Sequence, residues 1–131
     1  MNDAQFILAF NKKCNELQYK DFCTLFVFCW ALRFQLPEKQ IIQNLKEINN
    51  DFLKRPAKEG LTFFEIENRL KEFNIFLKGI SNGICPKIEN PYDFKIIRYS
   101  FHIDVIKNNN IIFNPEYQEK KPNCSYMVYK K

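Results

Sequence analysis

Apolar residues recur at helical spacing over the first part of the chain. Between residues 3 and 18 they stand three or four positions apart, with charged residues between them. Asn2 precedes this segment and suits the N-cap of a helix, because its side chain can accept from an unpaired backbone N–H. The spacing therefore predicts an amphipathic first helix. Its apolar positions are Phe6, Ile7, Phe10, Cys14 and Leu17.

The next segment, Phe22 to Leu32, is uncharged and apolar on every side. It is longer than most buried strands, which end after about four to eight residues. The pattern therefore predicts a helix that is buried all round and lies at the centre of the fold. Asp21 precedes this helix and Pro37 follows it.

Two more helices are predicted before the middle of the chain. Pro37 suits the first turn of a helix, and one apolar stripe continues from it to Phe52. Residues 54–60 are polar, contain proline and glycine, and indicate a loop. Thr62 and Glu65 then have the spacing of a capping box at the start of another helix. The stripe comprises Ile41, Ile42, Leu45, Ile48 and Phe52; the last helix has Leu61 and Ile66 at staple positions and a buried face of Phe63, Ile66, Leu70 and Phe73.

The second half of the chain has the pattern of a sheet. Residues 75–80 form a short apolar run, glycines and prolines follow, and residues 94–106 alternate like one long strand. On such a strand one face is apolar and the other polar, so the polar face is expected at solvent or a cleft. The apolar face would carry Ile97, Tyr99, Phe101, Ile103 and Val105, and the polar face Arg98, Ser100, His102 and Asp104.

Two further strands complete the expected sheet. Asn108 to Asn110 predict a turn into residues 111–113, and residues 125–130 suit a last strand. The predicted fold class is α+β, with N-terminal helices, including the central buried helix, packed on a C-terminal antiparallel sheet. We expect one domain over residues 1–131.

Composition narrows the class of protein. The chain has 131 residues and 46% hydrophobic content, which is too apolar for a disordered protein, and its longest uncharged run is too short to span a bilayer. The formal charge of +5 is spread along the chain, so it supports a nucleic-acid partner only weakly. Oligomeric state is not readable from this pattern.

Cysteine usage indicates a reducing environment. The chain has 5 cysteines, an odd number without the close pairing of a zinc site, and no basic-then-apolar signal peptide precedes them. We expect a cytoplasmic protein, or one delivered as an effector without an ordinary signal peptide. No metal and no organic cofactor is expected.

One of these cysteines has a setting suited to chemistry. Cys23 lies in the first turn of the predicted buried helix, where unpaired N–H groups and the positive end of the helix dipole favour a thiolate. A nucleophilic thiolate needs a base within hydrogen-bond reach, and His102 is the only histidine. Gln18, five positions before Cys23, is the candidate donor to an oxyanion.

The partner that would orient His102 depends on the length of a loop. Asp104, Asn114 and Glu116 are all candidates. If Asn108 to Asn110 form a three-residue loop, His102 and Asn114 become diagonal neighbours on one sheet face; a two-residue loop would place Asn114 on the opposite face.

Short motifs in this order resemble the compact papain-like cysteine hydrolases. The chain is similar to bacteriocin-processing peptidase domains and to papain-fold toxin or deamidase domains over residues 18–117. The matching motifs are Gln18, Asp21 and Cys23; residues 37–42, 61–66 and 73–77; residues 100–105; and Phe113-Asn114-Pro115. Two departures are Phe22, which separates the aspartate from the cysteine, and Thr24, which replaces a glycine.

The resemblance implies a catalytic mechanism and a role for each residue. It implies acyl transfer on an amide, either a peptide bond or a glutamine side chain, in a protein or peptide substrate. Cys23 would be the nucleophile, His102 the base, Asn114 the orienting residue and Gln18 the oxyanion donor.

A second interpretation belongs to a different functional class. A small, basic, aromatic-rich α+β domain also suits a non-catalytic binding module, such as a phage or mobile-element inhibitor that docks on a protein or nucleic acid through residues 54–58. The two interpretations differ in whether Cys23 and His102 come together.

Overall fold

The computed structural model describes residues 1–19, 22–52, 63–79, 94–98, 102–107, 110–115 and 124–130. Five helices precede the sheet in this part of the chain: α1 (Asp3–Glu16), α2 (Cys23–Leu32), α3 (Glu38–Gln43), α4 (Leu45–Phe52) and α5 (Phe63–Lys71). The strands are β1 (Ile75–Gly79), β2 (Phe94–Arg98), β3 (Ile103–Lys107), β4 (Asn110–Ile111) and β5 (Cys124–Lys130). The α+β class predicted from the sequence is confirmed. Residues 54–60, Asp21, Thr62 and Glu116, which entered the sequence predictions, lie outside the described residues.

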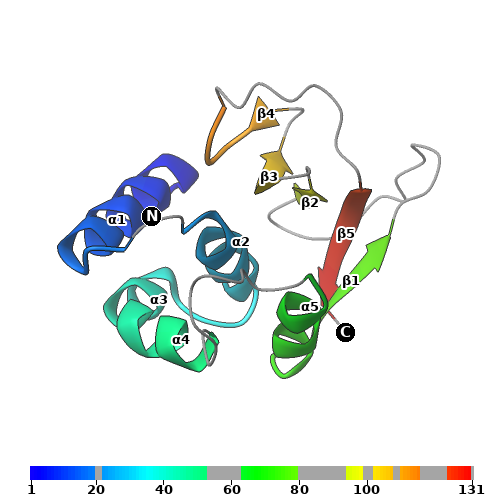
Figure 1. The fold of residues 1–131 in the computed structure, drawn as a ribbon, viewed down its shortest axis with the longest axis horizontal. Coiled ribbons are helices and arrows are strands. Elements are labelled where there is room, and N and C mark those ends of the chain that lie inside the picture. The colour runs from blue at the N-terminus through cyan, green and yellow to red at the C-terminus, as the bar shows by residue number, and fades with distance from the viewer. Residues whose placement is uncertain are drawn as a thin grey trace.

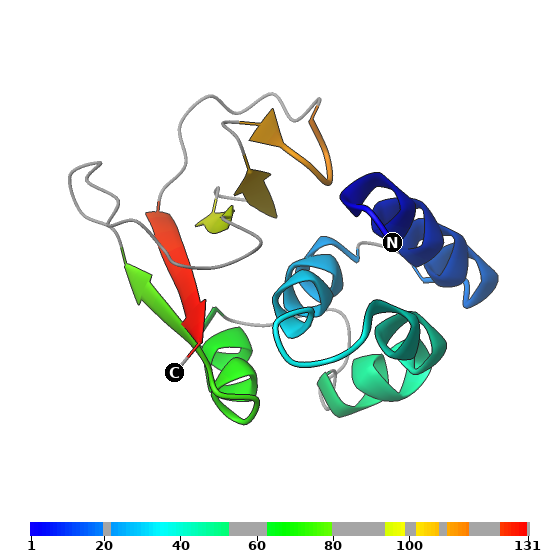
Figure 2. The ribbon, with the colours of Figure 1, turned by 180° about the vertical axis from the view of Figure 1, so that it is seen from behind.

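Helix α2 lies between the sheet and the helices α1, α3 and α4, and α5 lies beside β1 and β5 (Figure 1). The same arrangement is seen from behind, with α1, α3 and α4 on one side of α2 and the strands on the other (Figure 2). All eight residues from Leu25 to Leu32 are buried. The prediction of a central helix that is apolar all round is confirmed, because neighbours on every side leave no face of α2 for polar residues.

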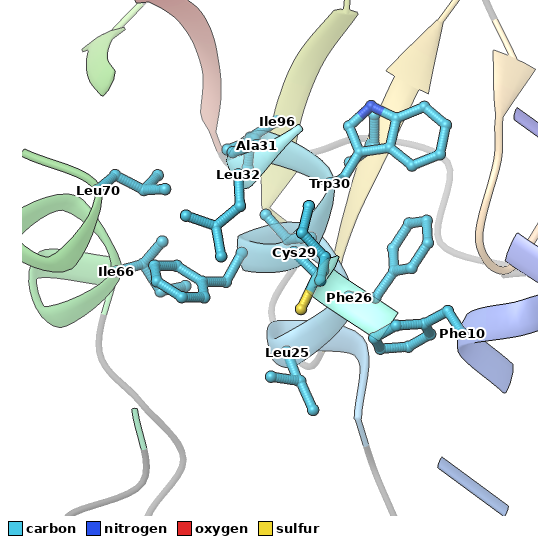
Figure 3. Packing of buried hydrophobic residues seen from close by; sticks show 14 of the residues in the cluster. Phe10, Leu25, Phe26, Cys29, Trp30, Ala31, Leu32, Ile66, Leu70 and Ile96 are labelled. Atoms are coloured by element: carbon cyan, nitrogen blue, oxygen red, sulfur yellow. The ribbon is translucent and has the colours of Figure 1, made fainter. Parts of the chain in front are cut away.

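The core forms where α1, α5 and the sheet meet α2. Phe10 from α1 and Ile66 and Leu70 from α5 approach the helix from opposite sides (Figure 3). Trp30 and Phe26 are fully buried, and burying a side chain of this size stabilises the folded state by about 1.5–3 kcal/mol. This packing holds both ends of α2 in fixed positions.

The first helix begins where its sequence predicts. The Asn2 side chain accepts from the backbone N–H of Gln5 at 2.8 Å, and the Gln5 side chain accepts from the backbone N–H of Asn2 at 3.0 Å. This reciprocal capping box satisfies two N–H groups that have no partner within the helix.

The predicted helix from Pro37 to Phe52 is wrong in one respect, because it is two helices. Asn44 leaves the helical region, with φ −98° and ψ 18°, and separates α3 from α4. Asparagine has a low helix propensity, and Ile41 before the break and Leu45 after it are both fully buried. The residues of the predicted apolar stripe are thus divided between α3 and α4.

The sheet has the strand order β1-β5-β2-β3-β4, and all its neighbouring strands are antiparallel. The predicted single strand over residues 94–106 is wrong: β2 and β3 form an antiparallel pair with Ile96 opposite Val105. Alternation has the same period in two paired strands as in one, and the residues between them include no glycine or proline to indicate a turn. The predicted faces change accordingly, because Ile97 lies opposite Asp104 and on the same face.

A partly buried ionic cluster joins the C-terminal end of α2 to α1, α3 and β3. The Arg33 guanidinium, only 2% exposed, donates to Asp3 Oδ1 and to Glu38 Oε1, each at 3.0 Å. Its Cζ lies 4.2 Å from the centroid of the Trp30 ring, as in a cation–π contact. Lys107, the last residue of β3, donates to the other oxygen of Asp3. Asp3 thus connects the end of α2 to the end of β3.

None of the helices in the described residues is both long enough and apolar enough to cross a membrane.

We expect the acid stability of the fold to depend on Asp3. Partial burial raises the pKa of Asp3, but hydrogen bonds and charges from Lys107 and Arg33 outweigh it and hold the pKa below its ordinary value. The stabilisation is therefore complete above the ordinary aspartate pKa of about 3.9 and is lost as the pH falls through the lowered pKa. Asp3→Asn should lower the free energy of unfolding at neutral pH by about 1 kcal/mol, since solvent screens this carboxylate, which is 36% exposed.

Urea unfolding at pH values from neutral to strongly acidic measures both effects. The matched control is Glu67→Gln, which removes the i,i+4 pair with Lys71 on the surface of α5 and should cost less than about 0.5 kcal/mol. Equal losses in the two variants, with the same pH dependence, would contradict the role assigned to Asp3.

Candidate functional site

Cys23 is the first residue of α2 and follows the N-cap residue Phe22. The first backbone hydrogen bond of the helix runs from the N–H of Phe26 to the carbonyl of Phe22 at 2.9 Å, so the N–H groups of the first turn have no partner within the helix. Among the described residues, no side chain hydrogen-bonds to this end of the helix, and its first turn has no acidic residue. The start of α2 therefore offers unpaired donors and a positive dipole end to an anion.

Exposure distinguishes Cys23 from the two other thiols whose burial is described. Cys14 and Cys29 are fully buried, and Cys23 is partly exposed. Burial raises the pKa of the Cys14 thiol to about 12, and burial together with the neighbouring Cys14 raises the pKa of Cys29 well above its ordinary value. Cys14 and Cys29 are therefore inert packing groups, and of these three thiols only Cys23 is accessible to a substrate.

His102 is held by a buried carboxylate. Its Nε2 lies 2.8 Å from Asp104 Oδ2, and the carboxylate accepts this hydrogen bond. The Asp104 side chain is fully buried, and that of His102 is 8% exposed. The Nε2 edge of the imidazole therefore faces the Asp104 carboxylate.

Three backbone N–H groups fix the Asp104 carboxylate in turn. Val105 donates to Oδ1 at 2.7 Å, Phe113 donates to Oδ1 at 3.1 Å, and Asn114 donates to Oδ2 at 2.9 Å. With the imidazole, each carboxylate oxygen thus accepts two hydrogen bonds. These four hydrogen bonds hold the carboxylate in one orientation, so it sets the orientation of the His102 ring.

The loop between β3 and β4, whose length determines whether Asn114 shares a sheet face with His102, is the shorter of the two alternatives. Lys107 pairs with Asn110, so two residues separate β3 from β4, which is the second of the two alternatives that the sequence left open. In this register Phe113 continues opposite Asp104, and Asn114 is exposed and contributes its backbone N–H instead. Asp104, one of the candidates that the sequence left open, is the residue bonded to His102.

The relative direction of α2 and β3 places Cys23 and His102 at the same end. Asp3 connects the last residue of β3 to Arg33 at the end of α2, and Phe113, bonded to Asp104, contacts the start of α2. The ten residues of α2 span about 15 Å and the five residues of β3 about 17 Å, at rises of about 1.5 and 3.3 Å per residue. Cys23 is the first residue of α2 and His102 directly precedes β3, so each lies at the end of its element that is far from the Asp3 cluster.

Aromatic rings connect the start of α2 to the segment that is bonded to Asp104. The Phe113 ring stacks on Phe26 with centroids 4.3 Å apart and meets the edge of Phe22 at 5.8 Å. Phe22 adjoins Cys23, and the backbone N–H of Phe113 bonds to Asp104. The hydrogen bonds found among the described residues include none between Cys23 and His102.

Gln18 occupies a backbone conformation that favours glycine. Its φ is 60°, at the position after the C-cap Leu17 of α1. Gln18 N–H donates to Asn15 at 3.1 Å and Tyr19 N–H donates to Cys14 at 3.0 Å, the two bonds of a Schellman motif. A side chain at this position costs about 1–2 kcal/mol relative to the right-handed region. The exposed Gln18 therefore occupies the C′ position of this motif at a conformational cost.

Two features of the site had no signal in the sequence analysis. Asp104 was placed on a polar face at solvent or a cleft, and its complete burial follows from its pairing with β2 and from the chain at 113–114. The sequence places Phe113 in a strand and in a family motif, but it does not predict the contacts of Phe113 with α2, because these join segments far apart in the chain. Neither burial nor ring stacking between distant segments can be derived from local periodicity.

No family model, curated protein or solved structure matches this chain. Among the described residues, no three histidine, cysteine, aspartate or glutamate side chains gather as a metal site.

We expect Asp104→Asn to destabilise the protein by about 2–3 kcal/mol. Each carboxylate oxygen accepts from two N–H donors, so either orientation of the amide would place its NH₂ group against two donors and leave them unpaired. Chemical denaturation of Asp104→Asn, with Glu72→Gln at an exposed position of the Arg69 pair as control, measures the loss. A loss of less than about 0.5 kcal/mol would contradict the hydrogen bonding described for Asp104.

Proposed function

We propose that this protein is a papain-like cysteine hydrolase that cleaves an amide, with Cys23 as nucleophile and His102 as general base and acid. The observation that supports the proposal is the pair of His102 and the buried, fully hydrogen-bonded Asp104 at the start of β3, the strand whose other end is joined through Asp3 to the end of α2. In this proposal Asp104, and not the Asn114 side chain, orients the imidazole.

The proposed reaction proceeds through an acyl-enzyme. Nδ1 of His102 accepts the Cys23 proton, and the thiolate forms a C–S bond with the amide carbonyl carbon. The carbonyl electrons become an oxyanion that accepts from N–H groups at the start of α2 and from the Gln18 amide. When the electrons return, the C–N bond breaks and the imidazolium gives its proton to the leaving amine. Water, deprotonated by His102, then attacks the thioester carbon, and the C–S bond breaks to release the acid.

The amide is a peptide bond or a glutamine side chain of a protein or peptide. The mechanism needs a reduced thiol and no cofactor, which suits a reducing compartment such as the cytoplasm, or an effector delivered into one.

A second candidate is a non-catalytic binding module. Two observations favour it: the described hydrogen bonds include none between Cys23 and His102, and Asp104 lies opposite Ile97, on the face of β3 away from the core residue Val105. In this case the His102–Asp104 pair would have only a structural role, which is to hold residues 113–114 against β3.

Alkylation of Cys23 separates the two candidates. With iodoacetamide near pH 6, we expect the wild-type thiol to react about tenfold faster than in His102→Ala, since a histidine-paired thiolate persists below the ordinary cysteine pKa of about 8.5. Peptide mass spectrometry distinguishes Cys23 from the buried Cys14 and Cys29. Equal rates in both proteins, with the pH dependence of a free cysteine, would favour the binding module.

Acyl transfer itself is tested with p-nitrophenyl acetate. We expect a burst of nitrophenol and an acetyl adduct on Cys23, both absent in Cys23→Ala, and a loss of about 100-fold or more in the acylation rate of His102→Ala. Acetylation of His102→Ala at the wild-type rate would exclude His102 as the base.

Gln18 gives a prediction in which stability and activity change in opposite directions. Gln18→Gly removes a side chain from a position with positive φ, so we expect the free energy of unfolding to rise by about 0.5–1 kcal/mol. The acylation rate should nevertheless fall by about tenfold or more, because one oxyanion donor is lost. The control is Asn74→Gly, at φ 59° after α5, which should leave acylation unchanged. Full activity in Gln18→Gly would remove Gln18 from the proposed site.

A further inference from the structure

Phe113 is the residue through which the two halves of the proposed site contact each other. Its backbone N–H donates to Asp104 Oδ1 at 3.1 Å, and Asp104 holds His102. Its ring stacks on Phe26 at 4.3 Å with an interplanar angle of 17° and meets Phe22 edge-on at 5.8 Å. Phe113 therefore contacts the carboxylate that orients the imidazole and also the residues that surround Cys23.

The contacts of the ring are concentrated at the start of α2. Phe10 of α1 joins the same group, with centroids 6.1 Å from Phe113 and 5.8 Å from Phe22. Packing of these rings determines how far β3 and the following chain stand from the first turn of α2. Displacements of about 1 Å between reacting groups are enough to change rates about 100-fold.

We infer that Phe113 is a positioning residue of the proposed hydrolase, whose ring sets the separation between the Cys23 thiol and the His102 imidazole. The inference rests on the proposed function. Phe113 has no part in the chemistry itself; it acts through Asp104 on one side and through Phe22 on the other.

The backbone and the ring of Phe113 can be separated by substitution. Phe113→Leu keeps the N–H that donates to Asp104 and removes the ring that stacks on α2. The hydrogen bonds of His102 and Asp104 should therefore remain while the spacing to Cys23 changes. Phe113→Tyr keeps the ring and serves as the conservative variant.

Phe73→Leu is the matched control. Phe73 is also half-buried and also packs edge-on against α2, with its centroid 6.4 Å from that of Phe28, but it follows α5 and lies outside the Phe113 group. Both Leu variants remove an aromatic contact of α2, and Phe113→Leu should lose more stability because its ring also meets Phe22 and Phe10. Only Phe113→Leu removes a contact to the first turn.

The readout is the pH profile of Cys23 alkylation by iodoacetamide in each folded variant. We expect the rate near pH 6 to fall about tenfold in Phe113→Leu, with the profile moving toward that of free cysteine at about pH 8.5. Phe113→Tyr and Phe73→Leu should keep the wild-type profile. A purely structural role for Phe113 would change stability without moving this profile.

The possible failures are distinguishable. If wild-type Cys23 itself has the profile of free cysteine, the proposed function and this inference are both overturned. If the wild-type thiol is reactive at pH 6 and Phe113→Leu keeps that profile, the inference alone is overturned. An equal shift in Phe73→Leu would also overturn it, because any loss of packing around α2 would then have the same effect.

Discussion

The burial of α2 on every side is the constraint on which the rest of the structure depends. Eight consecutive residues of this helix are withdrawn from water, and no single layer could cover them. Helices α1, α3 and α4 lie on one side and the sheet on the other (Figure 1). The first turn is the part of α2 that stays partly exposed, so the same packing that makes the core also leaves Cys23 accessible.

Different interactions join strand β3 to this helix at its two ends. At the end of α2 the fastening is ionic, through Asp3, which bonds both Arg33 and Lys107. At the start of α2 it combines the stacking of Phe113 with the hydrogen bonds of Asp104. Because these two sets of contacts are separated by the length of the helix, together they hold β3 alongside α2.

The interpretation of Asp104 changes most between the sequence and the structure. A buried carboxylate is unfavourable unless it is fully hydrogen-bonded, and here backbone groups from two segments supply three of its four bonds. The same bonds that make its burial tolerable orient His102. The same hydrogen bonds therefore serve the structural role and the proposed catalytic role of Asp104. The two candidate functions differ only in whether the oriented His102 acts on Cys23.

Local patterns were enough to predict the amphipathic α1 with its Asn2 cap, the fully buried α2 and the α+β class, because periodicity and capping depend on neighbouring residues. They also identified Cys23 and His102 as the candidate pair. Alternation could not show that residues 94–106 are two strands, because paired strands have the same period as one. The length of the loop before Asn110, the burial of Asp104 and the contacts of Phe113 were decided only by tertiary structure, since each depends on which distant segments meet.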